Sequence, residues 1–177
     1  QAVELLHQRH VAHLDLSLGN ILISLDTECF WGQQLYANHP YIIDFELSKT
    51  LEFGPGEQTA IELPSESIHV ENFGHTHLDP YSFDVWLLSK ALESGPLMLT
   101  YNNDLSTVPW IIRWYIGWLR GNEAGCLGVC TCRPTVTRAR WVLRGIRTWV
   151  CIGESITGLF GLRALYQRLR YSALSVP

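Results

Sequence analysis

Apolar residues recur at helical spacing in five stretches of the chain. The first covers residues 1–9, and the others are 80–92, 107–120, 135–150 and 154–171. Asp79-Pro80 is typical of a helix start, because Asp accepts hydrogen bonds from unpaired N–H groups and Pro fits the first turn. The stretch that follows is apolar on nearly every side, so we expect a buried, central helix.

Two short runs of β-branched and apolar residues, 21–23 and 41–43, lie beside turn-forming residues. They predict the two strands of a small hairpin. The polar stretch 24–40 between them is expected to form a long loop, and residues 50–78 show no periodicity and are expected to form another. The pattern predicts an α+β fold that is predominantly α-helical, with a short β-hairpin followed by a helical bundle.

The composition suits one domain with its own core. The chain has 177 residues, of which 47% are hydrophobic and 17% are charged. Its formal net charge of −4 argues against a nucleic-acid-binding protein, because phosphate contacts need a basic surface. The most apolar run, Val108 to Leu119, is about half as long as a bilayer span, so we expect a buried helix and no transmembrane segment.

Cysteine usage and charge distribution bear on where the protein works. The chain has 5 cysteines and no signal peptide, so we expect reduced thiols and an intracellular protein, cytoplasmic or nuclear. Arginines crowd the last quarter, and residues 151–177 are expected to form a basic helix or tail. Such a tail would contact an acidic partner or a membrane, or would form a solvated helical face.

Two polar motifs stand next to the predicted strands. Asp15 is followed five positions later by Asn20 at the start of one strand, and Asp44 follows the other strand. Carboxylate and amide oxygens are the ligands that Mg²⁺ prefers, which suits Asn20 and Asp44. Asp15, on the loop before its strand, can accept the proton of a substrate hydroxyl. Phosphoryl transfer requires mainly this kind of positioning and charge neutralisation.

The run His13-Leu14-Asp15-Leu16-Ser17-Leu18-Gly19-Asn20 resembles the protein-kinase catalytic loop H-R-D-L-x-x-x-N, and Asp44-Phe45-Glu46 resembles D-F-G. The resemblance implies that Asp15 is the catalytic base and that Asn20 and Asp44 bind magnesium and thereby ATP. It implies structural roles for Phe45 and for His13, which would pack under the magnesium loop. The substrate would be a Ser or Thr hydroxyl of a protein.

Three later features agree with this resemblance. Asp84, in the predicted central helix, resembles the Asp of the family's D-V-W-S pattern, which accepts hydrogen bonds from catalytic-loop amides. Arg133-Pro134-Thr135 resembles the family's R-P-T, and Ala60-Ile61-Glu62 is the best candidate for A-P-E. The resemblance implies a buried Glu62–Arg133 ion pair. It also suggests a carboxy-terminal catalytic lobe covering residues 1–150, similar in particular to fungal protein-kinase-like domains.

The sequence also departs from the family pattern. The family's Arg, Lys and Gly positions are occupied by Leu14, Ser17 and Glu46, and loops near 26–39 and 121–132 are longer than expected. No glycine-rich loop and no strand Lys are present, so we expect the ATP-gripping amino-terminal lobe to be missing and ATP binding by this chain alone to be poor. Alternatives to a kinase are a pseudokinase scaffold and a small-molecule phosphotransferase of the aminoglycoside or choline kinase type.

The long segment before Arg133 contains Cys126-x-x-x-Cys130-x-Cys132. Three cysteines so close together can indicate a metal cluster. This spacing lacks C-x-x-C and a nearby His, which disfavours zinc. The favoured interpretation is an incidental loop, or non-coding sequence retained by error.

Overall fold

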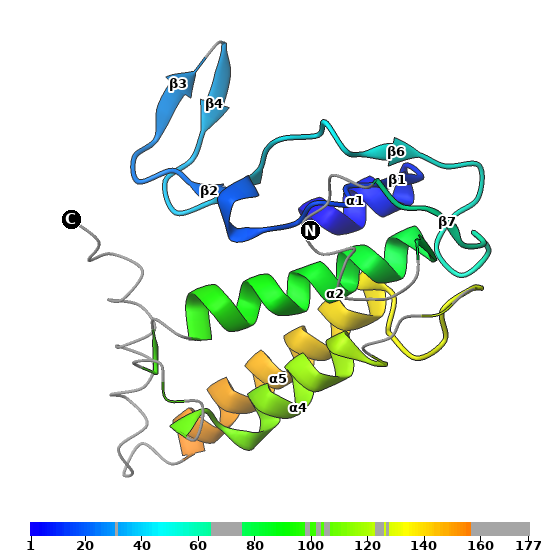
Figure 1. The fold of residues 1–177 in the computed structure, drawn as a ribbon. Helices are drawn as coiled ribbons and strands as arrows, with labels where there is room; N and C mark the ends of the chain where they lie inside the picture. The colour runs from blue at the N-terminus through cyan, green and yellow to red at the C-terminus, as the bar shows by residue number, and fades with distance from the viewer. Residues whose placement is uncertain are drawn as a thin grey trace.

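Figure 1 shows the fold of the chain in a computed structural model. The structure describes residues 1–30, 32–64, 76–97, 100–101, 104, 107–122, 126 and 128–156. These residues form four α-helices and four two-stranded antiparallel sheets. The predicted combination of helices with a small antiparallel hairpin is therefore confirmed, but the structure has four strand pairs where one hairpin was expected.

Helix α2 (Pro80–Leu92) is the centre of the molecule. Ten of its 13 residues are buried, as the apolar pattern predicted. Asp79 is its N-cap, and its carboxylate accepts hydrogen bonds from the Tyr81 N–H at 3.0 Å and the Ser82 N–H at 3.2 Å. Figure 1 shows α2 between helix α1 (Ala2–Gln8) with the small strands on one side and helices α4 and α5 on the other.

Helix α4 (Trp110–Arg120) packs against α2, and helix α5 (Val136–Ile156) contacts both α4 and α1. The predicted helix at 107–120 is confirmed with a later start. The predicted break between 150 and 154 is wrong, because α5 continues through it; a single interior glycine such as Gly153 costs only about 1 kcal/mol. The rest of the predicted helix 154–171, from residue 157 on, lies outside the described residues. Within the described part of the chain, no helix has the length and apolar composition that crossing a bilayer requires.

Two strand pairs are nested one inside the other. Strand β1 (Val11–Ala12) pairs with β6 (Lys49–Thr50), and between them β2 (Ile21–Ile23) pairs with β5 (Pro40–Ile42). The inner pair confirms the predicted hairpin, with its second strand one residue earlier. Because the pairs are nested, the segments that join them, 13–20 and 43–48, lie side by side.

Two stretches predicted as irregular loops contain short strands. Strands β3 (Glu28–Phe30) and β4 (Gln33–Leu35) form a second hairpin, which projects away from the helices in Figure 1. Strand β7 (Ile61–Glu62) pairs with β8 (His77–Leu78). The prediction of a long irregular loop at 24–40 is therefore wrong in its middle part, where β3 and β4 form a largely exposed hairpin. Residues 65–75 of the second predicted loop lie outside the described residues.

Candidate functional site

The two segments between the nested strands are joined by hydrogen bonds. The Ile43 N–H donates to the Asn20 carbonyl at 3.0 Å, and His13 Nε2 lies 3.1 Å from the Ile43 carbonyl. The His13 ring is fully buried and packs against the Phe45 ring, with centroids 4.9 Å apart. The structure thus brings Asn20 and His13 next to the segment that carries Asp44, and His13 packs beneath that segment as expected.

Asp15 and Asn20 are in direct contact. Asn20 Nδ2 donates to Asp15 Oδ2 at 2.7 Å and to the Asp15 carbonyl at 2.9 Å. Both residues are half-buried. Because the amide nitrogen is occupied by these two acceptors, Oδ1 is the Asn20 atom that is suited to a cation. The contact also fixes the orientation of the Asp15 carboxylate.

Leu14 and Asp44 both have left-handed backbone conformations, with φ of 67° and 60°. Non-glycine residues there carry strain of roughly 1–3 kcal/mol and persist only where the surroundings hold them. Leu14 is held because its side chain is fully buried in the core. Asp44 is exposed, and its Oδ1 is 3.4 Å from the Glu46 N–H. Such positions are frequent at functional sites, but His10 and Asn38, outside these two segments, have the same conformation.

Asp84 in α2 binds the backbone at the start of the segment 13–20. Its Oδ1 accepts from the Leu14 N–H at 2.7 Å, and its Oδ2 accepts from the His13 N–H at 2.8 Å. These are the hydrogen bonds that the resemblance implied, and the carboxylate is fully buried. A third partner, His7 Nε2, lies 2.9 Å from Oδ2. Sequence reasoning missed His7, although its spacing of four from Val3 places it on the inward face of the first helix.

The expected ion pair between Glu62 and Arg133 is wrong. Glu62 is exposed on β7, and its carbonyl accepts a hydrogen bond from Lys49 Nζ at 2.8 Å. Arg133 is buried and donates to the carbonyls of Arg120 at 2.7 Å and Asn122 at 2.6 Å. Arg133 therefore satisfies carbonyls at the carboxy-terminal end of α4, because those groups have no partner within the helix.

A hollow of about 310 Å³ lies beside the first segment. One wall is residues 16–19, and the other is formed by α2 and the turn after it, including Lys90. Ser17 lines this hollow. Lys90 Nζ lies 5.3 Å from the centre of the Trp86 ring, so a cation is present on the opposite wall.

The Asn20 amide orients the Asp15 carboxylate, and the Asp44 carboxylate lies on the neighbouring segment. An open hollow lies between residues 16–19 and α2. Asn20 Oδ1 and the Asp44 carboxylate are oxygen donors of the kind that a hard divalent cation prefers. No protein-family model, curated protein or solved structure matches the chain.

Proposed function

We propose that this chain is the catalytic lobe of a protein-kinase-like phosphotransferase that uses ATP and Mg²⁺. The observation that carries the proposal is the Asp84 carboxylate, which binds the His13 and Leu14 amides. Asp15, the next residue, thereby has a defined position beside Asn20. This supports the functional interpretation of the motifs more strongly than their spacing does, since the contact spans 71 positions in the chain.

Each residue has a distinct role in the proposed reaction. The Asp15 carboxylate accepts the proton of a Ser or Thr hydroxyl and orients its oxygen toward the phosphoryl group. Asn20 and Asp44 hold magnesium, which supplies charge neutralisation on the phosphates when it is bound. Asn20 also donates to Asp15, so the base and the metal ligand keep a common geometry.

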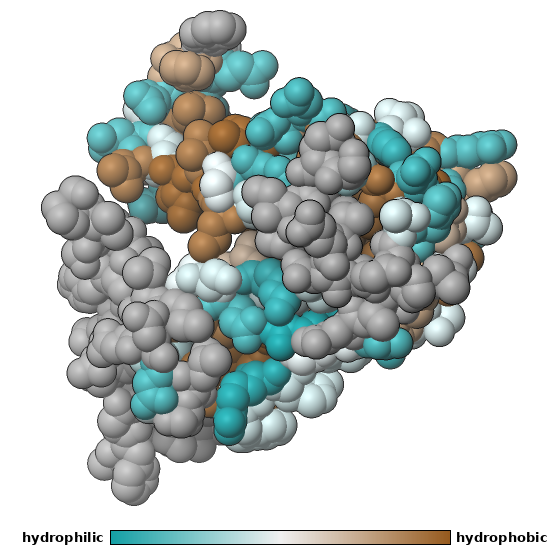
Figure 2. Space-filling view, in the orientation of Figure 1, coloured by the Kyte–Doolittle hydropathy of each residue, from teal (hydrophilic) through white to brown (hydrophobic). Residues whose placement is uncertain are grey.

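The surface around Asp15 suits the two proposed substrates, ATP and a protein Ser or Thr hydroxyl. The hollow of about 310 Å³ beside residues 16–19 would receive the substrate hydroxyl, and Lys90 offers a positive charge on its wall. Figure 2 shows apolar side chains gathered over β2, and the exposed ones near the site are Leu22, Ile23, Ile43 and Phe45. Such a surface suits an adenine base or a protein part that covers it. We place the reaction inside the cell, where ATP is available and thiols stay reduced.

Phosphoryl transfer tests the proposal directly. The protein in its natural full-length form should transfer phosphate from ATP to Ser or Thr peptides only when Mg²⁺ is present. Asp15→Asn preserves the shape of the side chain and an acceptor for Asn20, but it removes the base. We expect it to lower kcat by about 100-fold or more. The matched control, Asp26→Asn, changes an exposed residue before β3 and should leave the rate unchanged. Equal rates for Asp15→Asn and Asp26→Asn would refute the catalytic role.

Leu14, Ser17 and Glu46 favour a second candidate, a pseudokinase that serves as a binding scaffold. Leu14 is fully buried, so its position contributes to the core and offers no cation to a phosphate. If the protein is a scaffold, neither the wild type nor Asp15→Asn should transfer phosphate to peptides, aminoglycosides or choline. Transfer to those small molecules but not to peptides would instead identify a small-molecule phosphotransferase.

A further inference from the structure

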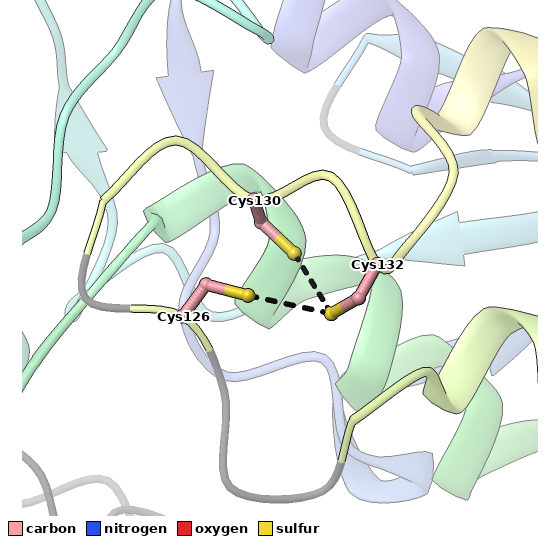
Figure 3. Close-up of side chains that lie close together, drawn as sticks. All are labelled: Cys126, Cys130 and Cys132. Atoms are coloured by element: carbon pink, nitrogen blue, oxygen red, sulfur yellow. Dashed lines mark hydrogen bonds between the residues drawn. The ribbon is translucent and has the colours of Figure 1, made fainter.

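Three thiols converge in the segment between α4 and α5 (Figure 3). Cys132 Sγ lies 3.4 Å from Cys126 Sγ and 3.3 Å from Cys130 Sγ. All three sulfur atoms lie within 4.8 Å of one another. We call Cys126, Cys130 and Cys132 the three-thiol cluster. The sequence spacing disfavoured a metal site, but the fold of the segment brings the sulfur atoms together despite it.

The backbone around the three-thiol cluster is held by contacts that do not involve sulfur. The Cys130 N–H donates to Asp79 Oδ2 at 2.9 Å, which attaches the segment to the start of α2. Arg133 next to Cys132 donates to carbonyls at the end of α4. Gly121 turns the chain out of α4 with a φ of 57°. The position of the sulfur atoms is therefore set by the helices, and a ligand would find them already gathered.

The environment favours loss of a proton from Cys132. Cys132 is exposed, and partial desolvation of its sulfur opposes ionisation, but the Asn122 N–H, the two neighbouring thiols and the Arg133 guanidinium outweigh this and lower the pKa of Cys132. Burial and hydrogen bonds with the Cys132 and Cys130 thiols raise the pKa of Cys126 to about 12. What favours a metal site is the geometry: three sulfur atoms within 4.8 Å of one another are soft donors that one soft metal ion can bind together.

We propose that the three-thiol cluster binds one Zn²⁺ ion through its three sulfur atoms, with the fourth position taken by water or another small ligand. Three thiolates on a tetrahedral zinc, with Zn–S of about 2.3 Å, stand about 3.8 Å apart. Small side-chain rotations convert the present separations to that value. Each remaining thiol proton passes to solvent as its sulfur binds, so affinity rises with pH.

The ion would join three elements. Its ligands lie between the end of α4 and the start of α5, and Cys130 is bonded to the residue that caps α2. Zinc would thus fix the segment that carries Arg133 against the central helix. This role is independent of phosphoryl transfer, because soft thiolates do not compete for Mg²⁺ and the Asp15 site does not bind a soft ion preferentially.

The test uses the whole chain, reduced with a phosphine and freed of metal with a chelator. Titration with Zn²⁺ should show one ion per chain and a rise in Tm. Titration with Co²⁺ should give the strong thiolate-to-cobalt absorption of a tetrahedral sulfur site. Cys126→Ser, Cys130→Ser and Cys132→Ser should each weaken binding by about 100-fold or more. Cys29→Ser, at an exposed cysteine on β3, is the matched control and should bind as wild type does.

Alkylation supplies a readout that does not depend on variants folding. Zn²⁺ should protect Cys126, Cys130 and Cys132 of the wild type from a maleimide, while Cys29 reacts at its usual rate. The proposal is overturned if no stoichiometric ion binds, if Zn²⁺ leaves all three thiols reactive, or if Cys29→Ser weakens binding as much as the cluster variants. A disulfide within the cluster that forms in air and persists in the reductant would also overturn it.

Discussion

The Asp84 carboxylate is fully buried and accepts hydrogen bonds from the His13 and Leu14 backbone and from the His7 ring. A buried carboxylate without donors would cost several kcal/mol, so these three donors are needed for the fold as well as for the site. They also hold Leu14 in its left-handed conformation. One residue of α2 therefore determines the path of the chain into Asp15.

Asp84→Asn tests this dependence. The amide keeps one acceptor oxygen but directs an NH₂ group toward a donor, which leaves buried polar groups unpaired. We expect the free energy of unfolding, measured with urea, to fall by about 3–5 kcal/mol. The exposed Asp26→Asn should change it by less than about 0.5 kcal/mol. Equal urea midpoints for the two variants would show that the Asp84 hydrogen bonds do not stabilise the fold.

At the scale of elements, local signals determined what could be predicted. Asp79 and Pro80 mark the start of α2 because capping acts within one turn. The end of α5 was misplaced, since Gly153 weakens a helix without ending it. The β3–β4 hairpin was missed because its strands are only three residues long and largely exposed, and Gly32, with a φ of 76°, is its main turn signal.

Gly121 gives a prediction for the junction of α4 with the three-thiol cluster. A Cβ at this position would lie 2.6 Å from Arg133 Cγ and 2.8 Å from the Cys132 carbonyl, and the φ of 57° disfavours any side chain. Gly121→Ala should lower the free energy of unfolding by at least about 1 kcal/mol and speed alkylation of Cys132. Thermal or urea unfolding and mass spectrometry of the alkylated protein measure the two effects.

The matched control for Gly121→Ala lies inside α4, one turn before Gly121. A Cβ at Gly117 would meet nothing within 4 Å, so Gly117→Ala should leave stability unchanged or raise it by up to about 1 kcal/mol. If both variants behave alike, the left-handed turn at Gly121 is not what positions the junction.

At the scale of the whole molecule, long-range pairs were the hardest to foresee. The Asp84 contacts with His13 and Leu14 were expected only through a family resemblance, because no local pattern links positions 70 and 71 apart. The same resemblance failed for Glu62, whose side chain lies on the exposed face of a short strand. No feature of the sequence indicated that Glu4 pairs with Arg140. Charged residues on predicted helices are ordinarily exposed to solvent, and nothing distinguishes these two from the others.

The Glu4–Arg140 ion pair joins α1 to α5, the two ends of the described chain. Burial opposes ionisation of Glu4, but the Arg140 guanidinium and a hydrogen bond from Thr137 outweigh it and lower the pKa of Glu4 below its ordinary value of 4.5. Because the folded pKa is depressed, the unfolded chain binds the proton more readily. The stabilisation is therefore complete above the unfolded pKa and is lost as pH falls through the folded value.

Glu4→Gln removes this titration while keeping the size of the side chain. At pH 7 it should lower the free energy of unfolding by roughly 1 kcal/mol, since the pair is partly exposed to solvent. The difference from wild type should shrink below about pH 4.5 and vanish in stronger acid. Urea unfolding across this pH range measures it, with Glu28→Gln on the exposed strand β3 as control. A difference that stays constant with pH would mean that Glu4 contributes packing and not charge, and α1 would then be held to α5 by apolar contacts alone.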